Sequence, residues 1–343
     1  MTADDYLTAS AFFTKVSSYF AEVDRRRTRG RPALMVFPED FATFLLLEGQ
    51  GHLLQHARTL DEAFRTIAMK EFPHLLQAMF RHRTLRTRAA FFTYGAPRVW
   101  RIWHQTMATL AKRYAVSVVA GTALLPESRL SYDSDRYVPQ NGRVYNFSFT
   151  VNPRGQVISV TRKVNLVPTQ EDVLQLTSGP LDAALRWVVL PDTPVKLATA
   201  ICYDAFVRPH TAREPHFVNV LDRLDRAGVQ LVAQPSANPW RWEELWPFDA
   251  PHQRPPRSRR QQWVEEGSYA ALKQCQSIEV VINPQLIMEF LDLHFDGQSA
   301  ILAREGQMVK TLAQSAYSRG PDANEVLYAA WRMPANGPGE SRI

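Results

Sequence analysis

The chain has 343 residues and a formal net charge of +6, with 45% hydrophobic and 22% charged residues. This balance is typical of a soluble globular protein that buries a sizeable core. No apolar stretch reaches the roughly 18 to 20 residues of a membrane-spanning helix, and the acidic start Met1–Asp5 lacks the basic residues of a secretory leader. We therefore expect a soluble, unexported protein.

The chain contains two cysteines, Cys202 and Cys275. They are too few for a disulfide framework and do not form the paired Cys-x-x-Cys of zinc or redox sites. A reducing, cytoplasmic location is the natural inference, and we expect neither a metal nor an organic cofactor.

Arginines form three clusters in the sequence. They occur at 25–27, 29 and 31, at 81, 83, 86 and 88, and at 254, 257, 259 and 260. Such clusters can bind phosphate-rich partners. Because no base-stacking motif or recognition helix accompanies them, we interpret them as solvated faces and expect no nucleic-acid partner.

Hydrophobic patterns predict strands and helices in alternation, which indicates an α/β class with mixed sheets. The predicted strands are 33–37, 116–120, 145–151, 157–162, 195–201, 229–233, 278–282 and 298–303. The predicted helices are 7–27, 60–82, 97–113, 215–227 and 257–274.

No Gly/Ser linker divides the chain, so we predict one domain over 1–333 and a flexible tail at 334–343. Within the domain, 41–113 is long for a connection between strands, and we expect it to form an insertion of two or three helices. That insertion could be a substrate lid, an oligomer contact or a packed cover over the core. The sequence leaves these alternatives open.

Three ionisable side chains each follow an apolar run that predicts a core strand. Glu39 closes 33–38, Lys163 closes 157–162, and Cys202 closes 195–201. A thiol at the junction of a buried strand and a loop is held rigidly and can reach a cleft, as a nucleophile requires. We expect the carboxylate, the ammonium and the thiol to converge.

The segments around these residues resemble the nitrilase, or carbon-nitrogen hydrolase, superfamily. Three motifs occur in its order, Phe37-Pro38-Glu39, Arg162-Lys163-Val164-Asn165-Leu166-Val167-Pro168 and Ile201-Cys202-Tyr203-Asp204. Further similar segments are Leu110–Thr122, Tyr145-Asn146, Asn152–Gly155, Ala233–Ala237 and Phe295–Ser299. Any one motif is weak evidence, whereas three in order are strong.

The resemblance implies a four-layer α-β-β-α sandwich and a homo-oligomer joined through helices. It also implies a second glutamate that helps to hold the lysine and the substrate. Glu171 stands eight residues after Lys163, at the spacing expected for this role, and its neighbour Asp172 is a competing carboxylate.

The chemistry of the three residue types agrees with this resemblance. An amide carbon is a poor electrophile, so a Cys202 thiolate would attack it and form a thioester. Glu39 would act as the base that removes the thiol proton and later activates water. Lys163 and the backbone N–H of Tyr203 would stabilise the negative oxygen of the tetrahedral intermediate.

Other candidate substrate-binding residues lie beyond the predicted strand 229–233. Asn238 and Trp240, with Tyr203, are expected to contact the substrate. Trp240 and its neighbour Trp242 could line a pocket beside the thiol, or could equally be rim packing. Cys275 lacks a comparable context and is interpreted as a core residue.

The chain departs from the family pattern in three places. The opening strand that family members usually place before the first helix is missing. The arginine and the aromatic residue exchange order in Cys202–Arg208, and Asn165 stands where histidine is common. These changes suggest a divergent branch.

We predict a cysteine-dependent hydrolase of a non-peptide C–N bond, acting on a small-molecule amide or N-carbamoyl compound. Amide is favoured over nitrile because Tyr203-Asp204 follows the thiol, where nitrilases proper tend to have Trp-Glu. Two alternatives remain, a soluble acyltransferase that uses the same site and an inactive scaffold that binds a partner. The identity of the substrate cannot be read from the chain.

Overall fold

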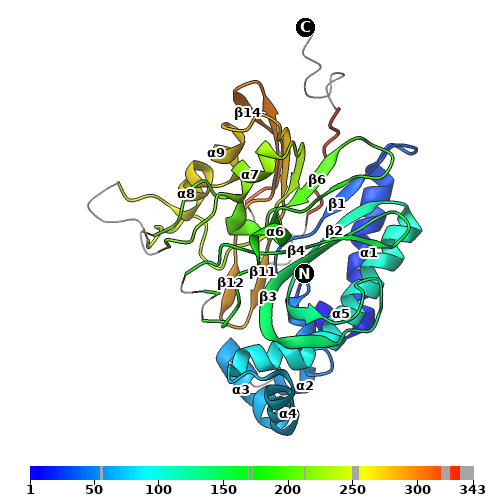
Figure 1. The fold of residues 1–343 in the computed structure, drawn as a ribbon, viewed down its shortest axis with the longest axis vertical. Helices are drawn as coiled ribbons and strands as arrows, with labels where there is room; N and C mark the ends of the chain where they lie inside the picture. The colour runs from blue at the N-terminus through cyan, green and yellow to red at the C-terminus, as the bar shows by residue number, and fades with distance from the viewer. Residues whose placement is uncertain are drawn as a thin grey trace.

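A computed structural model describes residues 1–54, 57–168, 170–171, 173–211, 214–248, 255–317 and 325–332. The predicted tail 334–343 lies outside the described residues. Within these ranges, no helix has both the length and the hydropathy needed to cross a lipid bilayer. The fold is α/β with mixed sheets (Figure 1).

The first sheet has four strands in the order β1-β2-β3-β4. Its strands are β1 (Leu34–Val36), β2 (Ser117–Ser128), β3 (Pro139–Val151) and β4 (Val157–Arg162). β1 runs parallel to β2, and the other two pairs are antiparallel. Two helices, α1 (Ala9–Arg26) and α5 (Thr87–Tyr114), lie beside this sheet (Figure 1). Both contribute buried side chains to the core of this half of the molecule.

The second sheet has six strands in the order β14-β13-β9-β7-β6-β5. These are β5 (Trp187–Val189), β6 (Lys196–Thr199), β7 (Leu231–Ala233), β9 (Val280–Asn283), β13 (Ala300–Glu305) and β14 (Met308–Gln314). β6, β7 and β9 are parallel, and the outer pairs are antiparallel. Helices α7 (Val220–Arg226), α8 (Arg259–Glu266) and α9 (Ser268–Leu272) lie beside it, across the molecule from α1 (Figure 1).

Several short elements complete the described chain. They are the 3₁₀ helices η1 (Ala3–Tyr6), η2 (Thr43–Leu47) and η3 (Cys202–Ala205), the helix α6 (Leu181–Ala184), and the two-stranded pairs β8 (Ser236–Ala237) with β10 (Gln285–Leu286) and β11 (Met288–Phe290) with β12 (Leu293–Phe295). No strand precedes α1 among the described residues, and β1 is an edge strand of its sheet.

The two sheets face each other through aliphatic side chains. Val119 of β2 belongs to the same buried cluster as Leu197, Leu231 and Val280 of the second sheet. A separate cluster joins α7 and α9 to the outer face of the second sheet. All three residues of β7 are apolar and buried, because both faces of this central parallel strand are covered by other parts of the protein.

All eight predicted strands contain a strand in the structure, whereas two edge strands of the second sheet and the short paired strands β8, β10, β11 and β12 were missed. β5 and β14 are paired on one side only, and their residues are mostly exposed or half-buried. Their hydrophobic pattern is therefore weak, because solvent contact removes the constraint that makes core strands apolar.

The helix predictions were right in position and wrong in several bounds. The predicted helix 60–82 is two helices, α3 (Leu60–Lys70) and α4 (Phe72–His82), since Pro73 begins a new first turn. The predicted helix 257–274 is likewise interrupted, at Gly267 between α8 and α9. α5 begins ten residues before the predicted start at 97, because Pro97 lies inside the helix rather than at its beginning.

The predicted insertion at 41–113 contains η2, α2 (Gly51–Leu54), α3, α4 and most of α5, which is more helix than expected. α2, α3 and α4 project from the lower end of the molecule in Figure 1. Three apolar side chains of α4 at i, i+4 and i+8 are exposed, Phe72 by 57%, Leu76 by 37% and Phe80 by 82%. No other part of the described chain packs over this face of α4.

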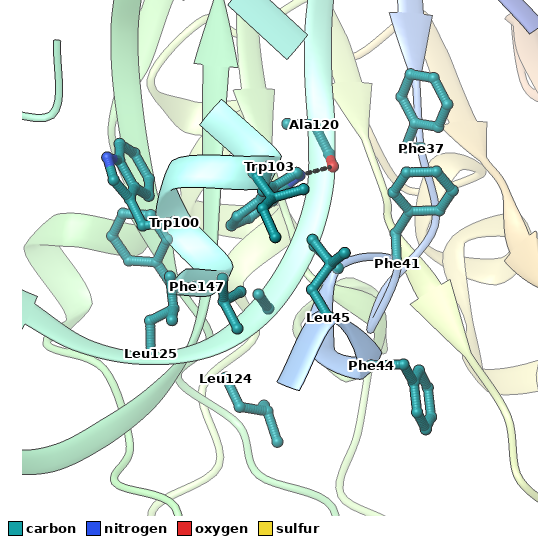
Figure 2. Close-up of a cluster of buried hydrophobic side chains, with 14 of the residues drawn as sticks. Phe37, Phe41, Phe44, Leu45, Trp100, Trp103, Ala120, Leu124, Leu125 and Phe147 are labelled. Carbon is teal, nitrogen blue, oxygen red and sulfur yellow. Dashed lines mark hydrogen bonds between the residues drawn. The ribbon is translucent and has the colours of Figure 1, made fainter. Parts of the chain in front are cut away.

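An aromatic core holds the loop that carries Glu39. Figure 2 shows Trp103 of α5 donating its indole N–H to the carbonyl of Ala120 in β2, at 3.0 Å. Phe37 and Phe41 lie beside this contact, with ring centroids 4.7 Å apart. Because these two phenylalanines flank Glu39 in sequence and are both buried, they fix the backbone on either side of the carboxylate.

Gly121 allows β2 to approach this loop. Its φ is +76°, and a Cβ there would lie 2.3 Å from the carbonyl oxygen of Pro38 and 2.8 Å from the Cβ of Phe41. We expect Gly121→Ala to lower the free energy of unfolding by about 3 kcal/mol, from positive-φ strain and overpacking together. Urea denaturation measures this change.

Gly306 provides a matched control for Gly121. It also has a positive φ, +64°, but a Cβ there would meet nothing within 4 Å. Gly306→Ala should therefore cost only about 1 to 2 kcal/mol, from backbone strain alone. Equal losses at the two positions would contradict the close approach of β2 to the Glu39 loop.

Candidate active site

Three of the four predicted catalytic residues lie just beyond a strand. Glu39 follows β1, Lys163 directly follows β4, and Cys202 begins η3 just after β6. All three side chains are buried, with exposed fractions of 3% or less. Two sheets thus contribute residues to one site.

The cysteine is held in a constrained backbone conformation. Cys202 has a φ of +46°, which is uncommon for a residue with a side chain. Its N–H donates to the carbonyl of Pro235 at 2.8 Å, and its carbonyl accepts from the Gln234 side chain at 3.0 Å. The loop after β7 therefore sets the position of the thiol, and strain of this kind is typical of functional sites.

The lysine lies between two carboxylates. Lys163 Nζ is 2.8 Å from Glu39 Oε1 and 2.7 Å from Glu171 Oε2. The Asn146 side-chain amide donates to both glutamates, at 2.7 Å to Glu39 and 3.1 Å to Glu171. An ammonium has three N–H donors, so two hydrogen bonds to carboxylates leave one for a substrate oxygen.

Backbone N–H groups also donate to both carboxylates. Glu39 Oε2 accepts from the N–H of Ala237 at 2.9 Å, and Glu171 Oε2 accepts from the N–H of Val167 at 2.8 Å. Glu171 is 7% exposed. The competing carboxylate at 172 lies outside the described residues.

The thiol lies close to the Glu39 carboxylate. A side-chain hydrogen bond with Glu39 contributes to the electrostatics of both groups, and Cys202 Sγ is also 3.8 Å from the carbonyl oxygen of Ala237. Glu39 is therefore a candidate base for the thiol proton.

Burial dominates the protonation equilibria of the site. It raises the pKa of the Cys202 thiol, and the negative charge of Glu39 raises it further. Burial also raises the pKa of Glu39, although Lys163 opposes this and Glu171 adds to it. Burial disfavours the ammonium of Lys163, yet Glu171 and Glu39 together raise its pKa well above the ordinary value. The resting site at neutral pH thus combines a thiol with a charged lysine.

Asp204 ties the cysteine loop to the lysine loop. Its carboxylate accepts from the backbone N–H of Val164 at 3.1 Å and of Asn165 at 2.8 Å. Burial raises the pKa of Asp204 to about 7, and these hydrogen bonds oppose the rise. The Asp that follows Cys-Tyr in the sequence therefore positions the backbone next to Lys163.

The predicted substrate-binding residues have distinct surroundings. The hydroxyl of Tyr203 donates to Glu214 at 2.7 Å and its ring stacks on His210, so the side chain is committed to packing. The backbone N–H of Tyr203 has no acceptor among the described residues. Asn238 is fully buried, and its side chain bonds the carbonyl oxygens of Trp240 and Asp296.

The two tryptophans also differ. Trp240 is half-buried, whereas Trp242 is 3% exposed and packs in the same cluster as Cys202. Trp242 is therefore a core residue, and Trp240 lies at the edge of this aromatic cluster.

Asn146 was not predicted as a site residue, and the surroundings of two arginines were predicted wrongly. Asn146 stood out only as part of a hairpin strand, because nothing in the sequence shows which strand residue faces a distant carboxylate. Arg257 and Arg259 were interpreted as parts of a solvated face, which is wrong, since they are 7% and 2% exposed. Arg260 of the same cluster is exposed, as expected.

No group of three or more His, Cys, Asp or Glu side chains suited to a metal ion occurs in the part of the chain that the structure describes. A cavity of about 1360 Å³ is lined in part by Leu34 and Val36 of β1 and by Leu231 and Ile282 of the second sheet. The four candidate catalytic side chains do not line it.

A comparison with models of known protein families identifies the family of this chain. Residues 5–330 match the family model described as "Carbon-nitrogen hydrolase". The chain belongs to the carbon-nitrogen hydrolase family. The resemblance found in the sequence is thereby confirmed. Among curated proteins, this carbon-nitrogen hydrolase has no significant match.

Solved structures of the superfamily share its fold at low sequence identity. A carbon-nitrogen hydrolase from Helicobacter pylori G27 is 13% identical, with a TM-score of 0.52 over 91% of this chain and 83% of that chain. A mutant of the Nesterenkonia AN1 amidase from the nitrilase superfamily is 14% identical, with a TM-score of 0.51 over 92% and 84%. Another mutant of that amidase, with acrylamide added at its active site cysteine, is 14% identical, with a TM-score of 0.50 over 92% and 86%.

Proposed function

We propose that this carbon-nitrogen hydrolase is a cysteine-dependent amidohydrolase that acts on a small-molecule amide or N-carbamoyl compound. The observation that carries the proposal is the Glu39–Lys163–Glu171 cluster with its distances of 2.7 and 2.8 Å, next to a strained cysteine. The structural neighbours support it, because one is an amidase with an adduct at its active site cysteine.

In the first half of the proposed reaction, the thiol of Cys202 attacks the amide carbon as Glu39 takes its proton. A C–S bond forms, and the carbonyl π electrons move onto oxygen. When the tetrahedral intermediate collapses, Glu39 gives the proton to the nitrogen, the C–N bond breaks, and ammonia or an amine leaves. The product on the protein is a thioester.

In the second half, Glu39 takes a proton from water while the water oxygen attacks the thioester carbon. The C–S bond then breaks, the carboxylic acid leaves, and the proton returns to sulfur. Glu39 is suited to both directions of transfer because burial raises its pKa toward neutrality.

Two donors would stabilise the negative oxygen in both halves. Lys163 has one N–H left after its two contacts with carboxylates, and the Tyr203 N–H lacks a protein acceptor in the described chain. Removing one such donor typically costs about 10²- to 10³-fold in rate. Glu171 and Asn146 would hold the Lys163 ammonium and the Glu39 carboxylate in position.

Further parts of the proposal concern the whole molecule. We take the chain as a single domain in a four-layer α-β-β-α arrangement, supported by the clusters that join the two sheets and their helices. We also take it as a homo-oligomer, and the exposed apolar face of α4 at Phe72, Leu76 and Phe80 supports an interface.

A panel of small amides and N-carbamoyl compounds tests the reaction class. Purified protein is incubated with each compound, and released ammonia is measured enzymatically. The proposal expects release from at least one class of compound, and none in Cys202→Ala. Ammonia release that survives in Cys202→Ala would overturn the assignment.

The pH dependence of kcat/KM tests the role of Glu39. A base must be ionised, so activity falls as pH drops through the pKa of Glu39. Because burial raises that pKa above its ordinary value of 4.5, we expect the acid limb of the profile to lie above pH 4.5. The limb is read from initial rates at low substrate concentration.

Glu171→Gln provides the matched comparison for the pH profile. The negative charge of Glu171 contributes to the raised pKa of Glu39, so removing that charge should move the acid limb to lower pH. An acid limb that stays in place in this variant would contradict the electrostatic coupling of the two carboxylates.

A further inference from the structure

Arg259 is buried without a carboxylate partner among the described residues. It is 2% exposed, and its hydrogen bonds go from Nε to Asn238 Oδ1 at 2.9 Å and from Nη1 to Gln262 Oε1 at 2.5 Å. Its neighbour Arg257 is buried too, but it is paired with Glu265 and with Glu266, each at 2.7 Å. Arg259 therefore carries a buried charge with no direct ion pair among the described residues, and Glu266 favours that charge only from a distance.

Three tryptophan rings surround the Arg259 guanidinium. Its central carbon lies 4.0 Å from the ring centroid of Trp246, 4.8 Å from that of Trp263 and 5.4 Å from that of Trp240. Cation–π contacts orient the planar guanidinium and replace part of its hydration. They leave its positive charge in place.

This position is unfavourable for a cation in the unliganded protein. Burial lowers the pKa of Arg259 to about 9. Arg259 is also the first residue of α8, where the helix dipole favours negative charge. Both effects would be relieved by a bound anion.

The guanidinium lies on the aromatic side of the cysteine. Trp240 and Trp263, which contact Arg259, pack in one cluster with Cys202. An ionised Cys202 would favour the charged form of Arg259, which shows that the two groups are within electrostatic range. Asn238, which Arg259 contacts, directly follows the residue whose carbonyl lies 3.8 Å from the sulfur.

The charges on the other side of the thiol would repel an anion. One ammonium, Lys163, lies between two carboxylates, Glu39 and Glu171, so this cluster carries more negative than positive charge. On the side of the thiol where the tryptophans lie, Arg259 instead supplies a positive charge. Its Nη2 edge has no hydrogen bond to the described protein, and one edge with one positive charge matches a carboxylate better than a doubly charged phosphate.

We propose that Arg259 binds a carboxylate of the substrate, so that the preferred substrates are amides or N-carbamoyl compounds that also carry a carboxylate. This inference rests on the proposed function for its substrate class. Asn238 and Gln262 orient the guanidinium, and the tryptophans enclose the carbon chain that joins the carboxylate to the scissile bond.

Alkylation of Cys202 by two reagents of the same shape tests this inference without requiring hydrolysis. Iodoacetate carries a carboxylate and iodoacetamide does not, and peptide mass spectrometry gives the rate of each at Cys202. In Arg259→Gln, the ratio of the iodoacetate rate to the iodoacetamide rate should fall about tenfold or more. Arg259→Lys keeps the charge and should keep most of the ratio.

Arg257→Gln is the matched control, since it removes a nearby buried arginine that is already paired with glutamates. Its ratio should stay close to that of the unmodified protein. If Arg259→Gln slowed both reagents equally, Arg259 would act on the thiol alone and the inference would be overturned. The same holds if the two arginine variants changed the ratio alike.

Kinetics with matched amides form the second arm. Succinamate and butyramide differ by a terminal carboxylate, and we expect kcat/KM to favour succinamate in the unmodified protein and to lose that preference in Arg259→Gln. Turnover of neutral amides only would overturn the inference and leave the proposed function intact. Absence of any turnover would count against the proposed function, while the alkylation ratio would still decide the role of Arg259.

Discussion

Cys202→Ala is expected to reduce amide hydrolysis by about 10⁴-fold or more, because loss of the nucleophile removes the covalent step. The fold should be retained. Cys202 contributes a small side chain to the cluster with Trp242 and Trp263, so truncation to alanine leaves only a small cavity. Initial rates of ammonia release and thermal unfolding curves measure the two effects separately.

Cys275→Ala is the matched control, since the chain has no third cysteine. Cys275 is partly buried and its Sγ lies 3.3 Å from the Ala271 carbonyl on α9, far in sequence from Glu39 and Lys163. Its removal should leave kcat/KM unchanged. Comparable losses in the two alanine variants would contradict a specific role for Cys202.

Lys163→Met should be damaging to both stability and activity. Methionine has a similar length but no charge, so Glu39 and Glu171 would face each other, buried and without their shared ammonium. Breaking a buried ion pair from one side typically costs about 3 to 5 kcal/mol. We expect a loss of this size in the free energy of unfolding, measured by urea denaturation.

The same variant should lose about 10²- to 10³-fold in kcat, since a donor to the developing oxyanion disappears. The double variant Lys163→Met/Glu171→Gln separates the two effects. Removing one carboxylate charge should restore part of the stability, while the rate stays low. If the double variant regained activity along with stability, the lysine would be a structural residue rather than an oxyanion donor.

The sequence predicted that Glu39, Lys163 and Cys202 would converge, because each closes an apolar run that predicts a core strand. Strand ends are readable from composition, and Glu39, Lys163 and Cys202 all stand at such ends in the structure. The residues that join these ends were much harder to predict. Asn146 lies within β3, and only the pairing of β3 with its neighbours determines that it faces Glu39 and Glu171.

The start of α5 and the burial of Arg259 were predicted wrongly because tertiary contacts determine both. Pro97 favoured a helix start, yet packing of α5 against the first sheet overrides that local preference. Arg259 was interpreted as part of a solvated face because no base-stacking motif or recognition helix accompanies its arginine cluster. Three tryptophans from separate parts of the sequence create its environment, and tertiary contacts of this kind leave no local signal.

The most direct test of the account is to identify the acylated residue during turnover. Protein is mixed with a hydrolysed amide, quenched in acid within the first turnovers, digested and examined by mass spectrometry. The account predicts an acyl group on the peptide that contains Cys202, present in the unmodified protein and absent in Cys202→Ala. An acyl group on another residue, or steady turnover in which Cys202 is never acylated, would contradict it.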